Sequence, residues 1–229
     1  MMKIKRNIAR IAGLLYVAVA ITGFFSNSTN GKLITGVKAT TIAENMNYFE
    51  WLFRISIVSD LMMVVSWIML AYMLYTLFET VNKNQGLLMI SFVLVGSATI
   101  CVNALNKLVA LFMLKGVDGL SAFNLGGPHY QALLFLDLFK GGNYIAHIFF
   151  GLWLFPLGYL VYKSKFMPRI LAILLTVAGF GYLTDFFTYF LLPDYGLRIT
   201  QFTFWGEVLL LIWLLIKGIK VPPEEVDIA

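Results

Sequence analysis

The chain has 229 residues, of which 60% are hydrophobic and only 13% charged, and its mean hydropathy is +0.83. A soluble domain is roughly 45–50% apolar and 25% charged, so this composition excludes an ordinary soluble protein and favours one that crosses a membrane several times. The net charge of +5 comes from basic residues beside apolar runs rather than from one basic patch, which excludes nucleic acid as a partner.

Six apolar runs follow one another along the chain, each about long enough to cross a bilayer. The first run follows four basic residues, and no small-residue cleavage pattern surrounds residues 24–27, which favours an uncleaved helix over a signal peptide. The sequence predicts an all-α fold, a polytopic membrane helix bundle that forms a single integral membrane domain over residues 1–229. We expect its six transmembrane helices at about 8–25, 51–78, 87–114, 143–162, 170–192 and 202–217.

Two further helices are expected at the membrane surface. Residues 40–50 close the longest polar stretch and predict an interfacial helix that leads into the second span. Residues 130–140 are apolar but precede Gly141 and Gly142, so they form either a separate interfacial helix or the first turns of a longer fourth span.

The orientation follows from the basic residues near the span ends, which favour the cytoplasmic side. With the N-terminus in the cytoplasm, six spans also place the C-terminus there, and ten of the 17 Lys and Arg residues then face the cytoplasm. These ten are Lys3, Lys5, Arg6, Arg10, Lys83, Lys163, Lys165, Arg169, Lys217 and Lys220.

Polar and ionisable residues inside apolar spans are costly, so they mark candidate functional positions. Because alternate spans reverse direction, residues scattered along the chain are expected at one depth, in the outer half of the membrane or at its outer surface. Helical spacing also places several of them on shared faces with small residues. The expected lining of an outward-facing polar cavity is Asp60, Asn103, Asn106, Lys107, Asp137, His147, Asp185 and Glu207.

Three interpretations of these residues remain open. The cavity binds a small molecule or a lipid, and the protein acts as a sensor, a carrier or an accessory subunit. Alternatively, the protein is a membrane-embedded hydrolase, in which His147 is the general base or a metal ligand, Asp185 orients it and Lys107 stabilises a developing anion. In the third interpretation the charges pair and hold helices together, Asp60 with Arg54 or Lys107, and Asp185 with His147.

The sequence does not indicate a cofactor, and it contains no metal-binding motif. Its only histidines are His129 and His147, and no metal-binding motif contains either of them, although carboxylate and imidazole can both bind zinc. The sequence leaves open whether the protein is an enzyme at all.

Four segments carry a resemblance to a known family: Arg10–Tyr16, Phe149–Tyr159, Pro168–Leu174 and Ala178–Asp185. They resemble the DUF4386 family of bacterial multi-span membrane proteins, whose function is unknown. The resemblance covers most of the chain and implies a multi-pass protein of the bacterial cytoplasmic membrane. The expected partners are the lipid bilayer and a lipid or small-molecule ligand, and assembly into a homo-oligomer is compatible with the sequence.

Overall fold

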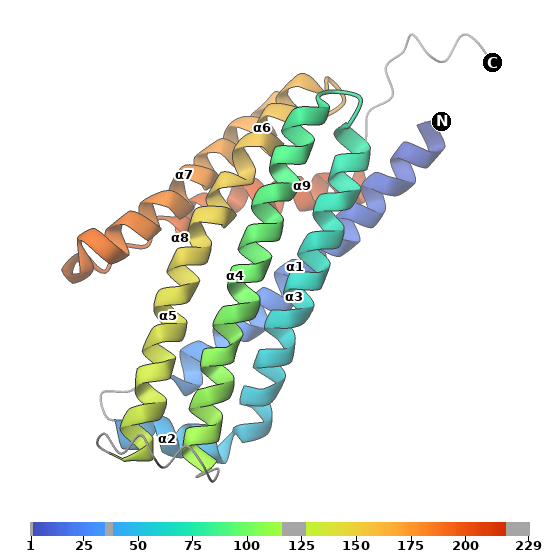
Figure 1. Cartoon of the computed structure of the whole chain (residues 1–229). Coiled ribbons are helices and arrows are strands. Elements are labelled where there is room, and N and C mark those ends of the chain that lie inside the picture. The colour runs from blue at the N-terminus through green and yellow to red at the C-terminus, as the bar shows by residue number, and fades with distance from the viewer. Residues whose placement is uncertain (1, 35–38, 116–126, 219–229) are drawn as a thin grey trace, which may run out of the picture. The chain divides into compact units, whose positions relative to one another are not determined.

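The computed structural model describes residues 2–34, 39–115 and 127–218, and these residues form helices and connections without a strand. Five helices in it are long and apolar enough to cross a membrane, and the apolar helical stretch Thr200–Ile216 is shorter. The helices are α1 (Met2–Leu33), α2 (Ala39–Tyr48), α3 (Glu50–Phe78), α4 (Lys83–Lys115), α5 (Pro128–Leu152), α6 (Leu154–Lys163), α7 (Arg169–Leu191), the 3₁₀ turn η1 (Pro193–Tyr195), α8 (Thr200–Thr203) and α9 (Trp205–Ile216) (Figure 1).

The chain divides into two compact units, which we describe separately. The first unit comprises Met1–Ala18, Ser66–Ser97 and Tyr144–Ala229, and the second comprises Val19–Val65 and Ala98–Asn143. Helices α1, α3, α4 and α5 therefore contribute residues to both units, whereas α6, α7, α8 and α9 belong to the first and α2 to the second.

In the first unit, α7 packs against α6, α8 and α9, and glycines allow the close approach (Figure 1). A Cβ at Gly206 of α9 would lie 2.5 Å from the carbonyl oxygen of Leu174 in α7. A Cβ at Gly151 would lie 2.8 Å from the carbonyl oxygen of Gly179. These backbones touch because neither glycine carries a side chain, which is the way small residues bring membrane helices together.

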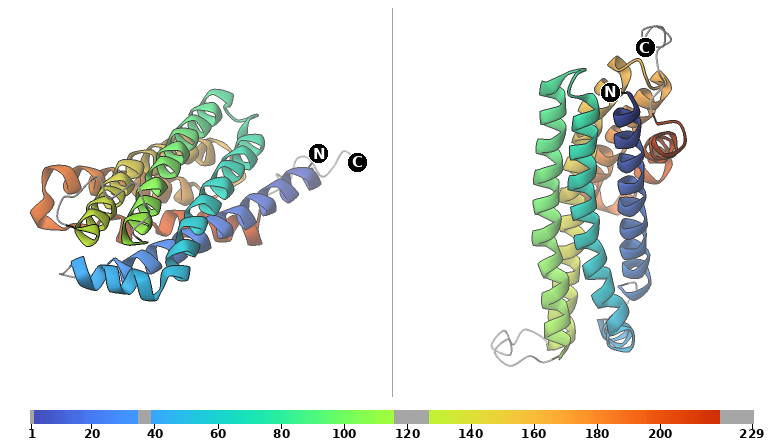
Figure 2. Two further views of the ribbon diagram at one scale, coloured as in Figure 1. Left: turned by 60° about the horizontal axis from the view of Figure 1, so that its bottom comes forward. Right: turned by 90° about the vertical axis from the view of Figure 1, so that its right-hand side faces the viewer.

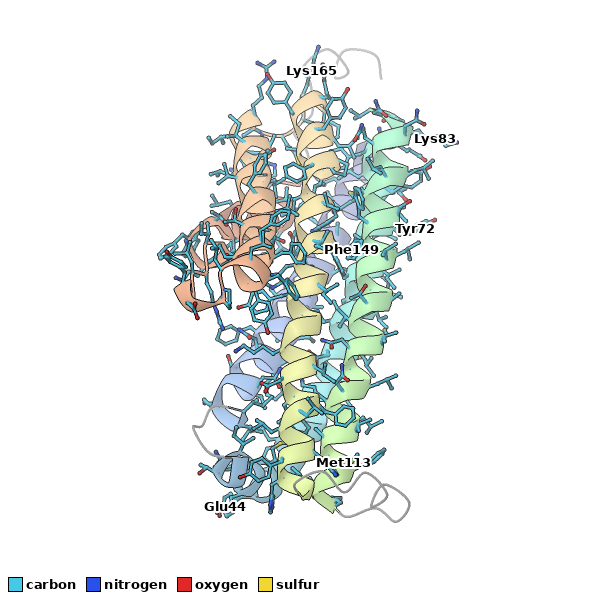
Figure 3. All side chains as sticks on the ribbon, turned by 60° about the vertical axis from the view of Figure 1, so that its left-hand side comes forward. Glu44, Tyr72, Lys83, Met113, Phe149 and Lys165 are labelled. Atoms are coloured by element: carbon cyan, nitrogen blue, oxygen red, sulfur yellow. The ribbon has the colours of Figure 1, made fainter. Side chains whose placement is uncertain are left out.

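The second half of α3 and the first half of α4 form a helical hairpin in the first unit (Figure 2). Asn82 ends the connection, and its side-chain oxygen accepts a hydrogen bond of 3.1 Å from the backbone N–H of Gln85. This is an N-cap, which satisfies one of the unpaired amides at the start of α4. Lys83, at the start of α4, and Lys165, beyond α6, lie at the same end of this unit (Figure 3).

The fourth predicted span is interrupted beyond His147. The helical pattern breaks at Trp153, between α5 and α6, three residues before Pro156. Proline lacks an amide hydrogen and its ring collides with the carbonyl four residues earlier, so a break at this point follows from the sequence. The whole stretch His129–Lys163 still qualifies as one candidate membrane span.

In the second unit, α2 packs against the ends of its neighbours and runs crosswise to α3, α4 and α5 (Figure 1). Ile42 and Met46 of α2 join Leu33, Phe53, Ala110, Leu111, Met113, Ala132 and Leu136 in one apolar core. A helix was expected at 40–50, and α2 supplies it at Ala39–Tyr48.

The two alternatives for residues 130–140 are resolved in favour of a continuous helix. Helix α5 runs from Pro128 to Leu152 without a break at Gly141 or Gly142. A Cβ at Gly142 would collide with the side chain of Asn103, so that glycine serves close packing of α4 and α5 rather than a turn.

Candidate functional sites

The residues predicted to line a cavity fall into two sets, one in each unit. His147, Asp185 and Glu207 belong to the first unit. Asp60, Asn103, Asn106, Lys107 and Asp137 belong to the second. A single cavity lined by both sets stays a prediction, and each set has its own geometry.

Lys107 is the centre of the second unit's set. Its side chain is fully buried, and its ammonium nitrogen lies 2.7 Å from Asp60 Oδ2. It also donates to Ser56 Oγ at 3.0 Å and to Ser26 Oγ at 3.3 Å. An ammonium has three donors, so the buried charge is both paired and fully hydrogen-bonded, which reduces the cost of burying it.

The pairing partner of Asp60 is therefore Lys107, one of the two partners proposed from the sequence. The other, Arg54, pairs with Glu50 at 2.6 Å on the same helix. Lys115 also reaches Glu50, at 2.7 Å. Both of these pairs are partly exposed, whereas Lys107 and Asp60 are buried.

Asn103 joins α4 to α5 in the second unit. Its amide donates to the carbonyl oxygen of Phe139 at 2.8 Å and to Asn143 Oδ1 at 3.0 Å. Its own carbonyl oxygen accepts from Asn106 at 3.0 Å. These bonds fix the register of two helices and occupy the polar atoms of Asn103. Asp137, in contrast, is exposed on α5 and does not take part.

Glu207 of α9 is held by two tyrosines in the first unit. Tyr16 of α1 donates to its Oε2 at 2.8 Å, and Tyr182 of α7 donates to its Oε1 at 2.9 Å. Each carboxylate oxygen thus has one hydroxyl donor, and three helices meet at this carboxylate. The tyrosines were not predicted from the sequence, because an aromatic residue in a membrane span is usually assigned to the lipid interface.

His147 lies among aromatic rings of α5 and α7. Its ring centroid is 5.2 Å from that of Tyr144, 5.4 Å from that of Tyr182 and 6.1 Å from that of Phe150. Tyr144 in turn stacks on Tyr189 with 3.9 Å between centroids. His147 Nδ1 is buried and has no hydrogen-bond partner among the described residues.

Asp185 is buried and organises the start of α8. It accepts hydrogen bonds from the backbone N–H of Ile199 at 2.5 Å and of Thr200 at 3.2 Å. The hydroxyl of Thr200 also donates to it. A carboxylate at a helix N-terminus satisfies unpaired amides and meets the positive end of the helix dipole. No hydrogen bond joins Asp185 to His147; the Asp185 oxygens accept from Ile199 and Thr200, in the segment before α9.

No metal centre emerges from the described part of the chain, which contains no group of three or more His, Cys, Asp or Glu side chains able to hold an ion. His129 is exposed at the start of α5. Cys101 is a free and exposed cysteine on α4.

The chain folds into helices, and several of them are long and apolar enough to cross a membrane. These features indicate an all-α, multi-pass membrane protein. The chain belongs to the DUF4386 family, a domain of unknown function whose model matches residues 11–218. It is also similar to an uncharacterized protein of Archaeoglobus fulgidus, with 37% identity over 166 residues that cover 72% of this chain and 85% of that protein. No solved structure matches the chain.

Proposed function

We propose that this membrane protein binds a lipid or small apolar molecule that carries one hydroxyl group, with the hydroxyl at His147. The observation that supports the proposal is the buried His147 Nδ1, which has no hydrogen-bond partner among the described residues. A buried polar atom without a partner costs roughly 1–3 kcal/mol, so it needs a compensating interaction. A ligand group at this atom supplies that interaction.

The surroundings of His147 suit an amphipathic ligand. The rings of Tyr144, Phe150 and Tyr182 lie 5.2, 6.1 and 5.4 Å from the imidazole ring, so a molecule bound beside it would contact aromatic carbon. A neutral imidazole has one donor and one acceptor nitrogen, and a hydroxyl group can both donate and accept. A hydroxyl therefore matches either tautomer, while the apolar part of the ligand contacts the rings.

The alternative of a hydrolase has weaker support. A histidine general base needs a group that orients its imidazole, as the carboxylate does in catalytic triads. Asp185 was the candidate, but its oxygens accept from Ile199 and Thr200. The geometry favours binding, which suits a sensor, a carrier or an accessory subunit.

We propose that the protein lies in the cytoplasmic membrane of a bacterium, with both termini in the cytoplasm. The similar protein of Archaeoglobus fulgidus comes from an archaeon, so the comparison does not supply the bacterial location. The support is the distribution of charge in the first unit. Lys5 hydrogen-bonds Thr80 of the α3–α4 connection, and Lys83 and Lys165 lie at one end of the unit (Figure 3). Basic residues gathered at one end favour the cytoplasmic side for that end.

The test compares dodecanol with dodecane as probes of the purified protein in a nanodisc. We expect dodecanol, and not dodecane, to raise the unfolding temperature of the wild type, because only the alcohol offers a hydroxyl group. His147→Phe keeps an aromatic ring but removes both nitrogens, so the difference between the probes should disappear.

The matched control is His129→Phe, which changes the other, exposed histidine and should respond as the wild type does. An equal response of the wild type to both probes, or of His147→Phe and His129→Phe to the alcohol, would contradict the proposal.

A further inference from the structure

The buried ammonium of Lys107 is surrounded by oxygen atoms from two helices. Asp60 Oδ2, Ser56 Oγ and Ser26 Oγ lie 2.7, 3.0 and 3.3 Å from the nitrogen. Ser26 comes from α1, while Ser56 and Asp60 come from successive turns of α3. The lysine itself reaches them from α4.

The serine hydroxyls are oriented to act as acceptors toward this ammonium. Ser56 uses its hydrogen to donate to the carbonyl oxygen of Phe53 at 2.7 Å, which leaves its lone pairs for Lys107. Ser26 is likewise an acceptor for Asn30 at 3.3 Å. Lone pairs and one carboxylate converge on a single point, which is the arrangement that a cation requires.

Two aromatic rings complete the surroundings. The Lys107 nitrogen lies 4.7 Å from the ring centroid of Phe139 and 5.7 Å from that of Phe53. The negative face of an aromatic ring attracts a cation within about 6 Å, and more strongly where water is absent. The rings therefore favour a cation at this point over a neutral group.

We propose that Ser26, Ser56 and Asp60 form a binding site for a monovalent cation, and that the ammonium of Lys107 is its resident ion. The single carboxylate balances one positive charge, so a monovalent cation leaves the buried site neutral. The three oxygen atoms lie at hydrogen-bonding distances from an ammonium nitrogen, so the site accommodates an ion of about the size of ammonium. K⁺ is close to an ammonium ion in size, whereas Na⁺ is smaller, so the site suits K⁺ better.

In the wild-type protein the ammonium of Lys107 is part of the chain and therefore always lies near the site. A tethered ammonium has a high effective concentration at the site, so a free ion cannot compete with it. The wild type holds α1, α3 and α4 together without a bound salt ion. This site lies in the second unit and does not depend on ligand binding at His147 in the first.

The experiment removes the tethered cation and offers a free one. Lys107→Ala is purified and its thermal unfolding is measured in KCl, NaCl and choline chloride at equal ionic strength. We expect K⁺, at about ten times its dissociation constant, to raise the unfolding temperature by about 3–6 °C over choline, with a smaller rise in NaCl. The wild type should unfold at one temperature in all three salts.

Two further variants identify the site. Lys107→Ala combined with Asp60→Asn lacks the carboxylate, so its unfolding temperature should not depend on the cation. Lys115→Ala removes an exposed lysine from the same helix and should behave as the wild type does.

Two outcomes would overturn the proposal. One is an equal unfolding temperature of Lys107→Ala in the three salts. The other is a Lys107→Ala protein that cannot be recovered folded even in KCl, because the free ion should then replace the lost charge. Lys107→Leu, which removes less volume and carries no donor, repeats the comparison and must show the same preference for K⁺.

Discussion

The hydroxyl of Tyr182 donates a hydrogen bond of 2.9 Å to Glu207 and joins α7 to α9 within the first unit. The ring of the same tyrosine meets His147 edge-on at 5.4 Å. One side chain therefore supports a buried carboxylate and forms a wall of the proposed ligand site. Changes at this tyrosine should affect both stability and binding.

We expect Tyr182→Phe to destabilise the protein by about 1–3 kcal/mol, because it leaves one oxygen of Glu207 without its donor. Tyr16→Phe should have a similar effect through the other oxygen. Differential scanning calorimetry of the purified variants measures the change. The control is Tyr72→Phe, at an exposed position of α3, and its unfolding temperature should match the wild type (Figure 3). Equal stability of all three variants would mean that the tyrosines do not support Glu207.

Asp185→Ala should destabilise the protein by about 2 kcal/mol or more, since it removes the acceptor of several hydrogen bonds at the start of α8. Asp185→Asn retains one oxygen acceptor and should lose less. The carboxylate of Asp194 is exposed in η1, so Asp194→Ala is the matched control and should be neutral. Limited proteolysis between residues 192 and 200 gives a local measurement, and faster cleavage of Asp185→Ala than of Asp194→Ala is expected.

The close approach of α9 to α7 predicts a strong effect at Gly206. A Cβ there would lie 2.5 Å from the backbone carbon and oxygen of Leu174, and backbone atoms cannot move aside as a flexible side chain can. We expect Gly206→Ala to lower the free energy of unfolding by about 1–3 kcal/mol.

Gly31→Ala is the control, because no atom lies within 4 Å of a Cβ at that helical position. It should be neutral or stabilising, since alanine favours a helix by roughly 0.5–1 kcal/mol over glycine. Reversal of this order would show that α7 and α9 do not pack as described.

The apolar pattern of the sequence predicts the helices well but not their ends. A run of apolar residues identifies a span, yet α1 continues to Leu33, into the polar stretch beyond the end expected at about residue 25. Ser26 and Thr29 of that stretch are buried, and Ser26 binds Lys107. The partner of Ser26 lies far along the chain, so local composition cannot reveal this contact.

The sequence also predicted the candidate sites only in part, because some of their contacts join residues that are far apart in the chain. Burial of Lys107 and Asp60 follows from their cost in an apolar span, because each needs a partner of opposite charge. The roles of Tyr16 and Thr200 depend on contacts with Glu207 and Asp185 that only the fold creates. The exposed Asp137 shows the converse, since a charge in an apolar run need not face the interior.

Membrane insertion can be tested with Cys101, the only cysteine of the chain. It is exposed near the middle of α4. If α4 crosses the membrane, the side chain at this position faces lipid. A charged maleimide reacts with the thiolate and does not enter hydrocarbon, so we expect no labelling in intact membranes and labelling after denaturation. Lys83→Cys, at the exposed start of α4, should be labelled in inverted vesicles if that end faces the cytoplasm. Labelling of Cys101 in sealed membranes would contradict a lipid-facing position.

The last prediction separates the charge of the Lys107–Asp60 pair from its packing. Removing one partner leaves an uncompensated buried charge, so Lys107→Met and Asp60→Leu should each destabilise by about 3–5 kcal/mol. The double variant removes both charges and keeps apolar volume, so it should be more stable than either single variant. The pair Arg54–Glu50 is the control, because it is partly exposed and such pairs contribute roughly 0–1 kcal/mol. Urea or thermal unfolding of the four proteins of each cycle gives the coupling free energy. Simple addition of the two single effects at Lys107 and Asp60 would mean that the buried contact carries no net interaction.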